Sequence, residues 1–149
     1  MTNSYSYDFL KNTFTFTPLG TTGFAAISFD NLFEGTGVEV EFDSDAWMET
    51  NNVGGGGTRS LSHNKSASIK VTLPKEDVRN DLLLEILNAD TAGDLSGTVT
   101  GSFMIRSLAN NEQVIFADVC WIKRQPNEVY NAEATGIEWE FRTKNCVRY

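Results

Sequence analysis

The sequence predicts a mainly β protein, an antiparallel β-sandwich or barrel with a single flanking α-helix. Short segments in which apolar and polar residues alternate recur along the chain, and Gly, Asn and Asp residues separate them. One segment alone has its apolar residues at helical spacing. Because the 149 residues suffice for one core and show no linker, we expect a single domain over 1–149.

The first half of the chain is predicted to form a polar arm followed by short strands. Residues 1–12 are rich in Ser, Asn and Tyr, and we expect them to form a polar N-terminal arm. Beyond residue 12, turn-forming residues such as Gly20, Gly35 and Asp43 punctuate the chain. The alternating segments between these turns predict strands at 13–17, 24–29, 37–42, 46–49 and 66–73.

The helix is predicted over residues 75–89. Pro74 suits its start, and Asp77 or Asn80 is a candidate for its N-terminal cap. The apolar stripe consists of Val78, Leu82, Leu83, Ile86 and Leu87. After the helix, alternation predicts strands at 97–106, 114–123 and 134–143. Asn110-Asn111 is a plausible turn that joins the first two of these strands into a hairpin.

Four consecutive glycines, Gly54–Gly57, predict a flexible loop over 51–58. This loop does not match a phosphate-binding loop, because Thr58-Arg59-Ser60 stands where a P-loop has Lys-Ser/Thr opening a helix. A plain connector is one interpretation. An assembly segment over 47–59 is the other, since a flexible loop that carries exposed apolar residues can become ordered against a neighbouring subunit. The apolar residues beside the glycines are Trp47, Met48 and Val53.

Charge indicates what the protein does not bind. The formal net charge is -8 and the isoelectric point is about 4.6, which excludes a general phosphate-binding surface. The chain also lacks an apolar run near the ~20 residues that a membrane helix needs, so we expect no membrane anchor. Without a recognisable secretory segment, we expect Cys120 and Cys146 to stay reduced in a cytoplasm.

Two segments repeat one strand pattern, Val-Glu-Val-Glu-Phe at 38–42 and Ile-Glu-Trp-Glu-Phe at 137–141. Alternation places the apolar residues of each strand on one face and its two carboxylates on the other. If the strands lie side by side, four carboxylates line one surface, and like charges opposite one another destabilise a sheet. Such a negative surface would repel a polyanion. The alternative interpretation is that each of the two strands exposes its carboxylates on an ordinary solvated sheet face. The carboxylates are Glu39, Glu41, Glu138 and Glu140.

Catalytic and metal-binding signatures are weak, and we expect neither activity. His63 is the single histidine, and no Gly-x-Ser-x-Gly element accompanies it, so a surface role is predicted. One His and two distant Cys do not complete a zinc site. Asp43-Ser44-Asp45 lacks the rest of a calcium loop and predicts a turn. The paired glutamates have equivalent surroundings, whereas a glycosidase needs contrasting ones. No cofactor is expected.

Several of these segments together resemble a known family. The acidic strand at 38–42 and the Asp-Ala-Trp element at 45–47 are similar to those of tail tube proteins of contractile-tailed bacteriophages. A Gly-rich loop, Arg59-Ser60, the segment 64–69, the helix start at 80–83 and the strand at 137–141 continue the likeness. It covers the chain from about Asp30 to its end.

The resemblance implies a structural, non-enzymatic virion protein. Six copies form a ring through a continuous barrel of strands, rings stack into a tube, and DNA passes through without specific binding. Sheath, baseplate and tail-terminator proteins are the further partners, and the tail is assembled in the host cytoplasm. Lumen-facing residues would be Glu39, Glu41, Glu138 and Glu140. The inter-ring loop would comprise Trp47, Met48, Val53, Gly54, Gly55, Gly56, Gly57 and Arg59, with 1–12 or 145–149 as further contacts.

Two alternatives remain open at the level of sequence. The chain could be the inner tube of a bacterial contractile injection system, because that assembly also needs rings. It could instead be a monomeric β-sandwich binding module, for instance for carbohydrate, with a tryptophan as stacking platform. The candidates are Trp47, Trp121 and Trp139, of which Trp139 belongs to the apolar face of its strand.

Overall fold

The computed structural model describes residues 12–19, 22–30, 32, 37–92, 97–107, 112–130, 132 and 135–149. The predicted N-terminal arm, apart from Asn12, and the predicted turn at 110–111 lie outside these residues. The elements are β1 (Asn12–Pro18), β2 (Ile27–Ser28), β3 (Val38–Phe42), β4 (Trp47–Asn51), β5 (Gly57–Leu61), β6 (Ala67–Pro74), α1 (Arg79–Thr91), β7 (Gly101–Ser107), β8 (Glu112–Ile122) and β9 (Gly136–Arg148).

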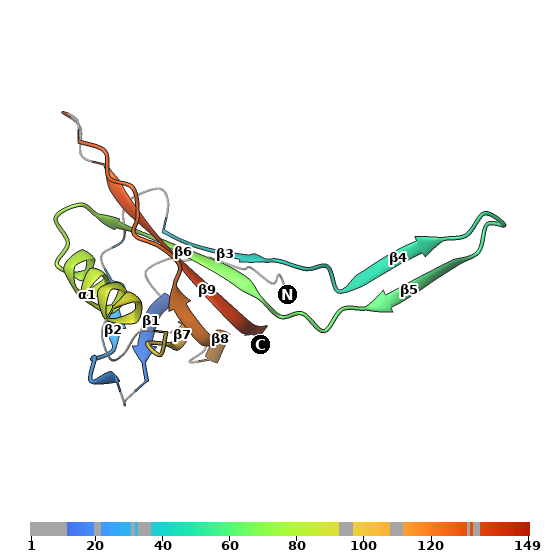
Figure 1. Ribbon diagram of the computed structural model, residues 1–149, viewed down its shortest axis with the longest axis horizontal. Coiled ribbons are helices and arrows are strands. Elements are labelled where there is room, and N and C mark those ends of the chain that lie inside the picture. Colours follow the sequence, from blue (N-terminus) through green and yellow to red (C-terminus); the bar gives the residue numbers. More distant parts are fainter. Residues whose placement is uncertain are drawn as a thin grey trace, which may run out of the picture.

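Antiparallel pairing joins most strands into one seven-stranded sheet in the order β2-β1-β7-β8-β9-β6-β3. The sheet curls into a half-barrel, with α1 on its inner side (Figure 1). The predicted mainly β fold with one flanking helix is confirmed, as is the antiparallel pairing of β7 with β8. The remaining strands, β4 and β5, form a two-stranded hairpin that projects far from the half-barrel (Figure 1).

The core fills the inner side of the half-barrel. Alternation along β6 and β9 turns Ile69, Val71, Leu73, Ile137, Trp139 and Phe141 inward, where each is almost fully buried. The ring of Phe141 packs 5.0 Å from that of Phe16 and 5.5 Å from that of Phe103, centroid to centroid. Cys120 and Cys146 are buried free thiols, and burial raises the pKa of both.

The helix begins later than the sequence predicts. Residues 75–78 form a turn, and the Asp77 carboxylate accepts a hydrogen bond from the Arg79 backbone N–H at 2.9 Å. Neither predicted cap acts as the N-cap residue, which is Val78, without a side-chain hydrogen bond. Leu83, Ile86 and Leu87 face the core as predicted. Leu82 does not, because at 100° per residue it falls beside the buried stripe, and neither does Val78, because it precedes the helix.

Strand β8 contains a bulge at Val119. Its register with β7 shifts by one residue between Gly101 and Phe103, and Val119 takes a φ of 49°. A left-handed backbone costs an L-residue roughly 1–2 kcal/mol, and a β-branched side chain fits it poorly. Because glycine adopts a positive φ without this strain, replacing Val119 by glycine lowers the free energy of the native state.

We therefore expect Val119→Gly to stabilise the protein by about 0.5–1 kcal/mol, after allowing for the greater freedom of glycine in the unfolded chain. Urea unfolding followed by circular dichroism measures the change. Val119→Ala is the matched control, because alanine removes the same β-branch but retains a Cβ; it should gain less. A loss of stability in the glycine variant would show that the bulge is not strained.

Candidate assembly surfaces

The four predicted glutamates share the outer face of the sheet, the face turned away from α1. Glu39, Glu41 and Glu138 are exposed and Glu140 is half-buried. Their apolar neighbours point inward, although Val38 and Val40 at the edge are only half-buried and Phe42 is 48% exposed. The alternation predicted for both segments is confirmed.

The two acidic strands are not adjacent, however, so the condition for a row of four neighbouring carboxylates is not met. Strand β6 lies between them and pairs with both. Its Lys70 stands between Glu39 on β3 and Glu140 on β9. On the other side of Glu140, the Lys123 ammonium lies 3.5 Å from the carboxylate. The outer face therefore alternates acids with bases, which removes the like-charge repulsion that adjacent carboxylates would create.

A second charged group on this face centres on Arg142 of β9. Its guanidinium donates to both carboxylate oxygens of Asp43, at 2.9 and 2.5 Å, and to the Ser68 hydroxyl at 2.6 Å. Ser68 is its neighbour on β6, and Asp43 comes directly after the last residue of β3. The hydrogen bonds from Arg142 hold the pKa of Asp43 below its ordinary value of 3.8. The sequence predicted only a turn here.

This ion pair should give stability that acid removes. Because folding lowers the pKa of Asp43, the pair stabilises the native state above the ordinary carboxyl range, and the contribution is lost as pH falls through the lowered pKa. We expect wild-type protein to melt at a higher temperature than Asp43→Asn at pH 7, and the gap to shrink as the pH is lowered below the ordinary carboxyl range. A gap that keeps the same size as the pH is lowered, measured by circular dichroism, would contradict this.

The β4–β5 hairpin, which we call the arm, replaces the predicted flexible loop. The glycine-containing turn is confined to residues 52–56, where the Asn52 N–H donates to the Gly56 carbonyl at 2.7 Å and Gly55 has a φ of 87°. Gly57 already belongs to β5, opposite Asn51. The four glycines therefore close a hairpin instead of connecting distant elements.

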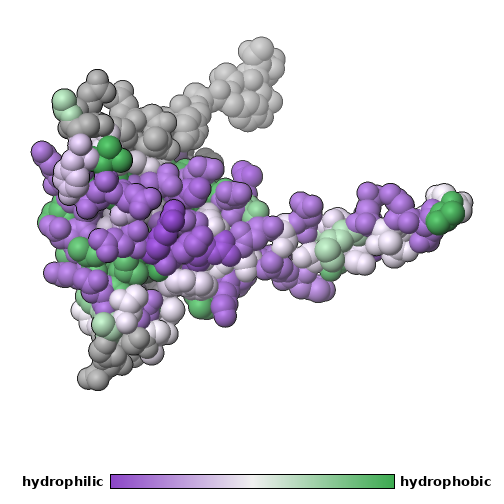
Figure 2. All heavy atoms as spheres, turned by 45° about the horizontal axis from the view of Figure 1, so that its top comes forward, coloured by the Kyte–Doolittle hydropathy of each residue, from purple (hydrophilic) through white to green (hydrophobic). Residues whose placement is uncertain are grey.

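Every residue of the arm is exposed, including its apolar ones. Trp47 is 44%, Leu61 50% and Met48 62% exposed, and Val53 at the turn is fully exposed. In Figure 2 most of the arm is hydrophilic or intermediate in hydropathy, with a pale apolar patch partway along it and a hydrophobic tip. The Arg59 guanidinium lies 4.2 Å from the centroid of the Trp47 ring. Because an isolated two-stranded hairpin is at best marginally stable in water, this arm is suited to docking.

Other predicted residues lie apart from these surfaces. His63 is exposed in the link between β5 and β6. Trp139 is buried, and its indole N–H donates to Asn80 at 2.8 Å, so it cannot serve as a stacking platform. In the segment 145–149, expected as a further inter-ring contact, residues 145–148 extend β9 and the Tyr149 N–H donates to the Val114 carbonyl at 2.8 Å.

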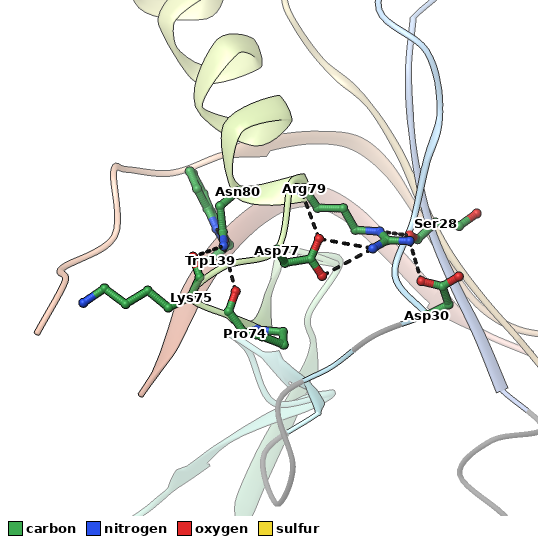
Figure 3. A network of polar contacts seen from close by, with 8 residues as sticks. All are labelled: Ser28, Asp30, Pro74, Lys75, Asp77, Arg79, Asn80 and Trp139. Atoms are coloured by element: carbon green, nitrogen blue, oxygen red, sulfur yellow. Dashed lines mark hydrogen bonds and ion pairs between the residues drawn. The ribbon is translucent and has the colours of Figure 1, made fainter. Parts of the chain in front are cut away.

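A polar network anchors the start of α1 and was not predicted. The Asn80 amide donates to the Pro74 carbonyl at 2.8 Å while its oxygen accepts from Trp139 (Figure 3). Arg79 pairs with Asp77 and Asp30 and donates to the Ser28 carbonyl. These contacts join β2, α1 and β9, so the network is structural.

No group of three or more His, Cys, Asp or Glu residues in the described part of the chain could hold a metal ion. Among the same residues, no helix is long and apolar enough to cross a membrane. The described residues form a half-barrel with a charged outer face and a projecting arm.

Comparison with solved structures assigns the fold. No protein-family model and no curated protein matches the sequence. A chain in the cryo-EM structure of the anti-feeding prophage cap (AFP tube terminating cap) superposes with a TM-score of 0.56 at 13% identity, over 99% of this chain and 93% of that one. A chain of the PVC sheath/tube terminator, from an extracellular contractile injection system in the extended state, gives 0.58 at 11% identity over 97% and 96%.

The PVC sheath-tube complex in the extended state provides a third match, with a TM-score of 0.57 at 11% identity over 96% of this chain and 90% of that one. This chain therefore shares its fold with chains of these cap, terminator and sheath-tube structures, over nearly the whole of both chains.

Proposed function

We propose that this chain is a structural subunit of a contractile tail or contractile injection system, and that copies of it form hexameric rings that stack into a tube. The projecting, fully exposed arm is the observation that carries the proposal, because a subunit that acted alone would have no use for it. The near-complete overlap with chains of tube and terminator assemblies supports it. We assign no catalytic residue and no cofactor.

Ring formation would use the edge of the sheet. Strand β3 is the last strand at its end of the sheet, and among the described residues it pairs only with β6. A free edge presents unpaired backbone N–H and C=O groups, which a strand of a neighbouring copy can satisfy. Closing six half-barrels in this way would leave no edge unpaired. The outer face of β3, β6, β9 and β8 would then line the lumen.

In this arrangement Glu39, Glu41, Glu138 and Glu140 face the lumen, interspersed with Lys70 and Lys123. The exposed glutamates would repel a DNA backbone, while the bases offset repulsion between the acids. Sheath, baseplate and terminator proteins are the further partners we propose. The arm, with Trp47, Met48, Val53, Gly54, Gly55, Gly56, Gly57 and Arg59, would contact the adjacent ring.

The lumen assignment predicts a DNA-retaining variant. Changing Glu39, Glu41, Glu138 and Glu140 to Lys raises the net charge of each subunit from -8 to 0 and makes the outer face basic. We expect tubes of this variant to hold DNA that nuclease cannot reach. The matched control changes Glu76, Asp81, Glu85 and Glu128, all exposed elsewhere, to Lys. Equal amounts of protected DNA in both variants would refute the assignment.

A terminator is the second candidate, because two of the matched structures are of terminating assemblies. A terminator caps a tube and need not polymerise, so the purified chain would form single rings only. Tubes of many stacked rings, seen by electron microscopy, favour the tube subunit. The third candidate, a carbohydrate-binding module, would have to use Trp47 or the half-buried Trp121, since Trp139 lies in the core.

A further inference from the structure

The arm is a continuation of the β3–β6 ladder beyond an irregular joint. Phe42 of β3 is opposite Ala67 of β6, and Trp47 of β4 is opposite Leu61 of β5. Residues 43–46 join β3 to β4 and residues 62–66 join β5 to β6, so the returning side has one residue more. An extra residue on one strand bends and twists a ladder locally. The direction of the arm is therefore decided at this joint.

Three hydrogen bonds connect the two sides of the joint to each other. The Asp43 N–H donates to the Ser66 carbonyl at 3.1 Å, and the Ser62 N–H to the Ala46 carbonyl at 2.9 Å. The Asn64 amide donates to the Ser44 hydroxyl at 2.7 Å. These bonds keep the two sides of the joint together but do not fix how the joint sits on the half-barrel.

Two ties connect the joint to β9 of the half-barrel. On the returning side, the Cys146 N–H donates to the Lys65 carbonyl at 2.9 Å. On the outgoing side the tie is made by side chains, from Arg142 to Asp43. Arg142 reaches across β6, and the Ser68 hydroxyl holds its guanidinium on the way. A planar guanidinium that binds both oxygens of a carboxylate fixes direction as well as distance.

We propose that the Arg142–Asp43 pair is a positioning device that locks the direction of the arm, so that the arm meets a second copy of this chain in one orientation. The proposal rests on the proposed function for its purpose. Strands of five residues at about 3.4 Å per residue make the arm roughly 17 Å long, so a swing of about 20° at the joint would move its tip by roughly 6 Å. A displacement of that size is larger than the distance between neighbouring strands of a sheet.

Double electron–electron resonance, which measures the distance between two spin labels, tests the lock directly in the unassembled protein. Spin labels at Thr50→Cys on the arm and Glu85→Cys on α1 report the arm direction, since both positions are exposed and the native thiols are buried. We expect a narrow distance distribution in wild-type background. Its width should at least double in Asp43→Asn and in Arg142→Gln, which remove the ion pair with little change of shape. Lys123→Gln is the matched control, because it breaks the neighbouring pair with Glu140 and leaves the joint intact.

The outcomes separate the lock from the function. Distributions of equal width in wild type, Asp43→Asn and Arg142→Gln would overturn the lock, whatever the assembly. Broadening in Lys123→Gln to the same extent would also overturn it. Broadening confined to Asp43→Asn and Arg142→Gln supports the lock even if the wild-type chain forms no ring or tube. Failure of the wild-type chain to form rings or tubes would overturn the proposed function alone.

Discussion

Deletion of Gly54–Gly57 is expected to abolish tube formation while leaving the half-barrel folded. The deletion removes most of the turn and the Gly57–Asn51 pair, so it shortens the arm and removes the native shape of its tip. No arm residue contributes to the core, since all residues from 47 to 61 are exposed. We therefore expect the circular dichroism spectrum and unfolding midpoint to change little, and sedimentation to show single rings or monomers in place of long tubes.

Gly54→Ala is the control for this deletion. An added Cβ at Gly54 meets no other atom within 4 Å, and the length of the turn is kept. This variant should assemble like the wild type. Long tubes from the deletion variant would show that stacking does not use the arm, and would leave only the sheet edge as an assembly surface.

Asn80→Ala is expected to cost about 3 kcal/mol of unfolding free energy. The side chain of Asn80 is buried, accepts from the Trp139 indole and donates to the carbonyls of Pro74 and Lys75 (Figure 3). Truncation leaves a buried indole N–H without an acceptor, which alone costs roughly 1–3 kcal/mol, and frees two carbonyls at the start of α1. Urea unfolding measures the loss.

Asn88→Ala is the matched control, because Asn88 is an exposed asparagine of the same helix. Alanine has the higher helix propensity, so this change should be neutral or slightly stabilising. A cost below about 1 kcal/mol for Asn80→Ala would mean that water or a side-chain rearrangement satisfies the Trp139 indole.

Local sequence patterns predicted most of the fold. Alternation placed the strands of the half-barrel to within a few residues, because one face of each strand is buried against the core. It could not say which strands are neighbours: β6 lies between β3 and β9, and this changes the outer face from acidic to mixed. Strand order depends on contacts between residues far apart in the chain, which leave no periodic signal.

The hairpin form of the arm and the polar contacts were missed for related reasons. The predicted strand at 46–49 overlaps β4, but β5 was not predicted, because it buries neither face and four glycines indicated a loop. Asn80 with Trp139, and Asp43 with Arg142, are pairs separated by 59 and 99 residues. Each residue taken alone fits a cap, a turn or a solvated strand face. Their roles come from the curl of the sheet that brings β9 beside β6.

The central claim is that this chain builds rings and tubes from copies of itself. Electron microscopy of the purified chain at high concentration, with sedimentation velocity on the same sample, tests it most directly. We expect rings of six subunits and hollow tubes of uniform bore. A chain that stays monomeric over the whole concentration range, with only small globular particles in the images, would contradict the claim and favour a binding module that uses Trp47.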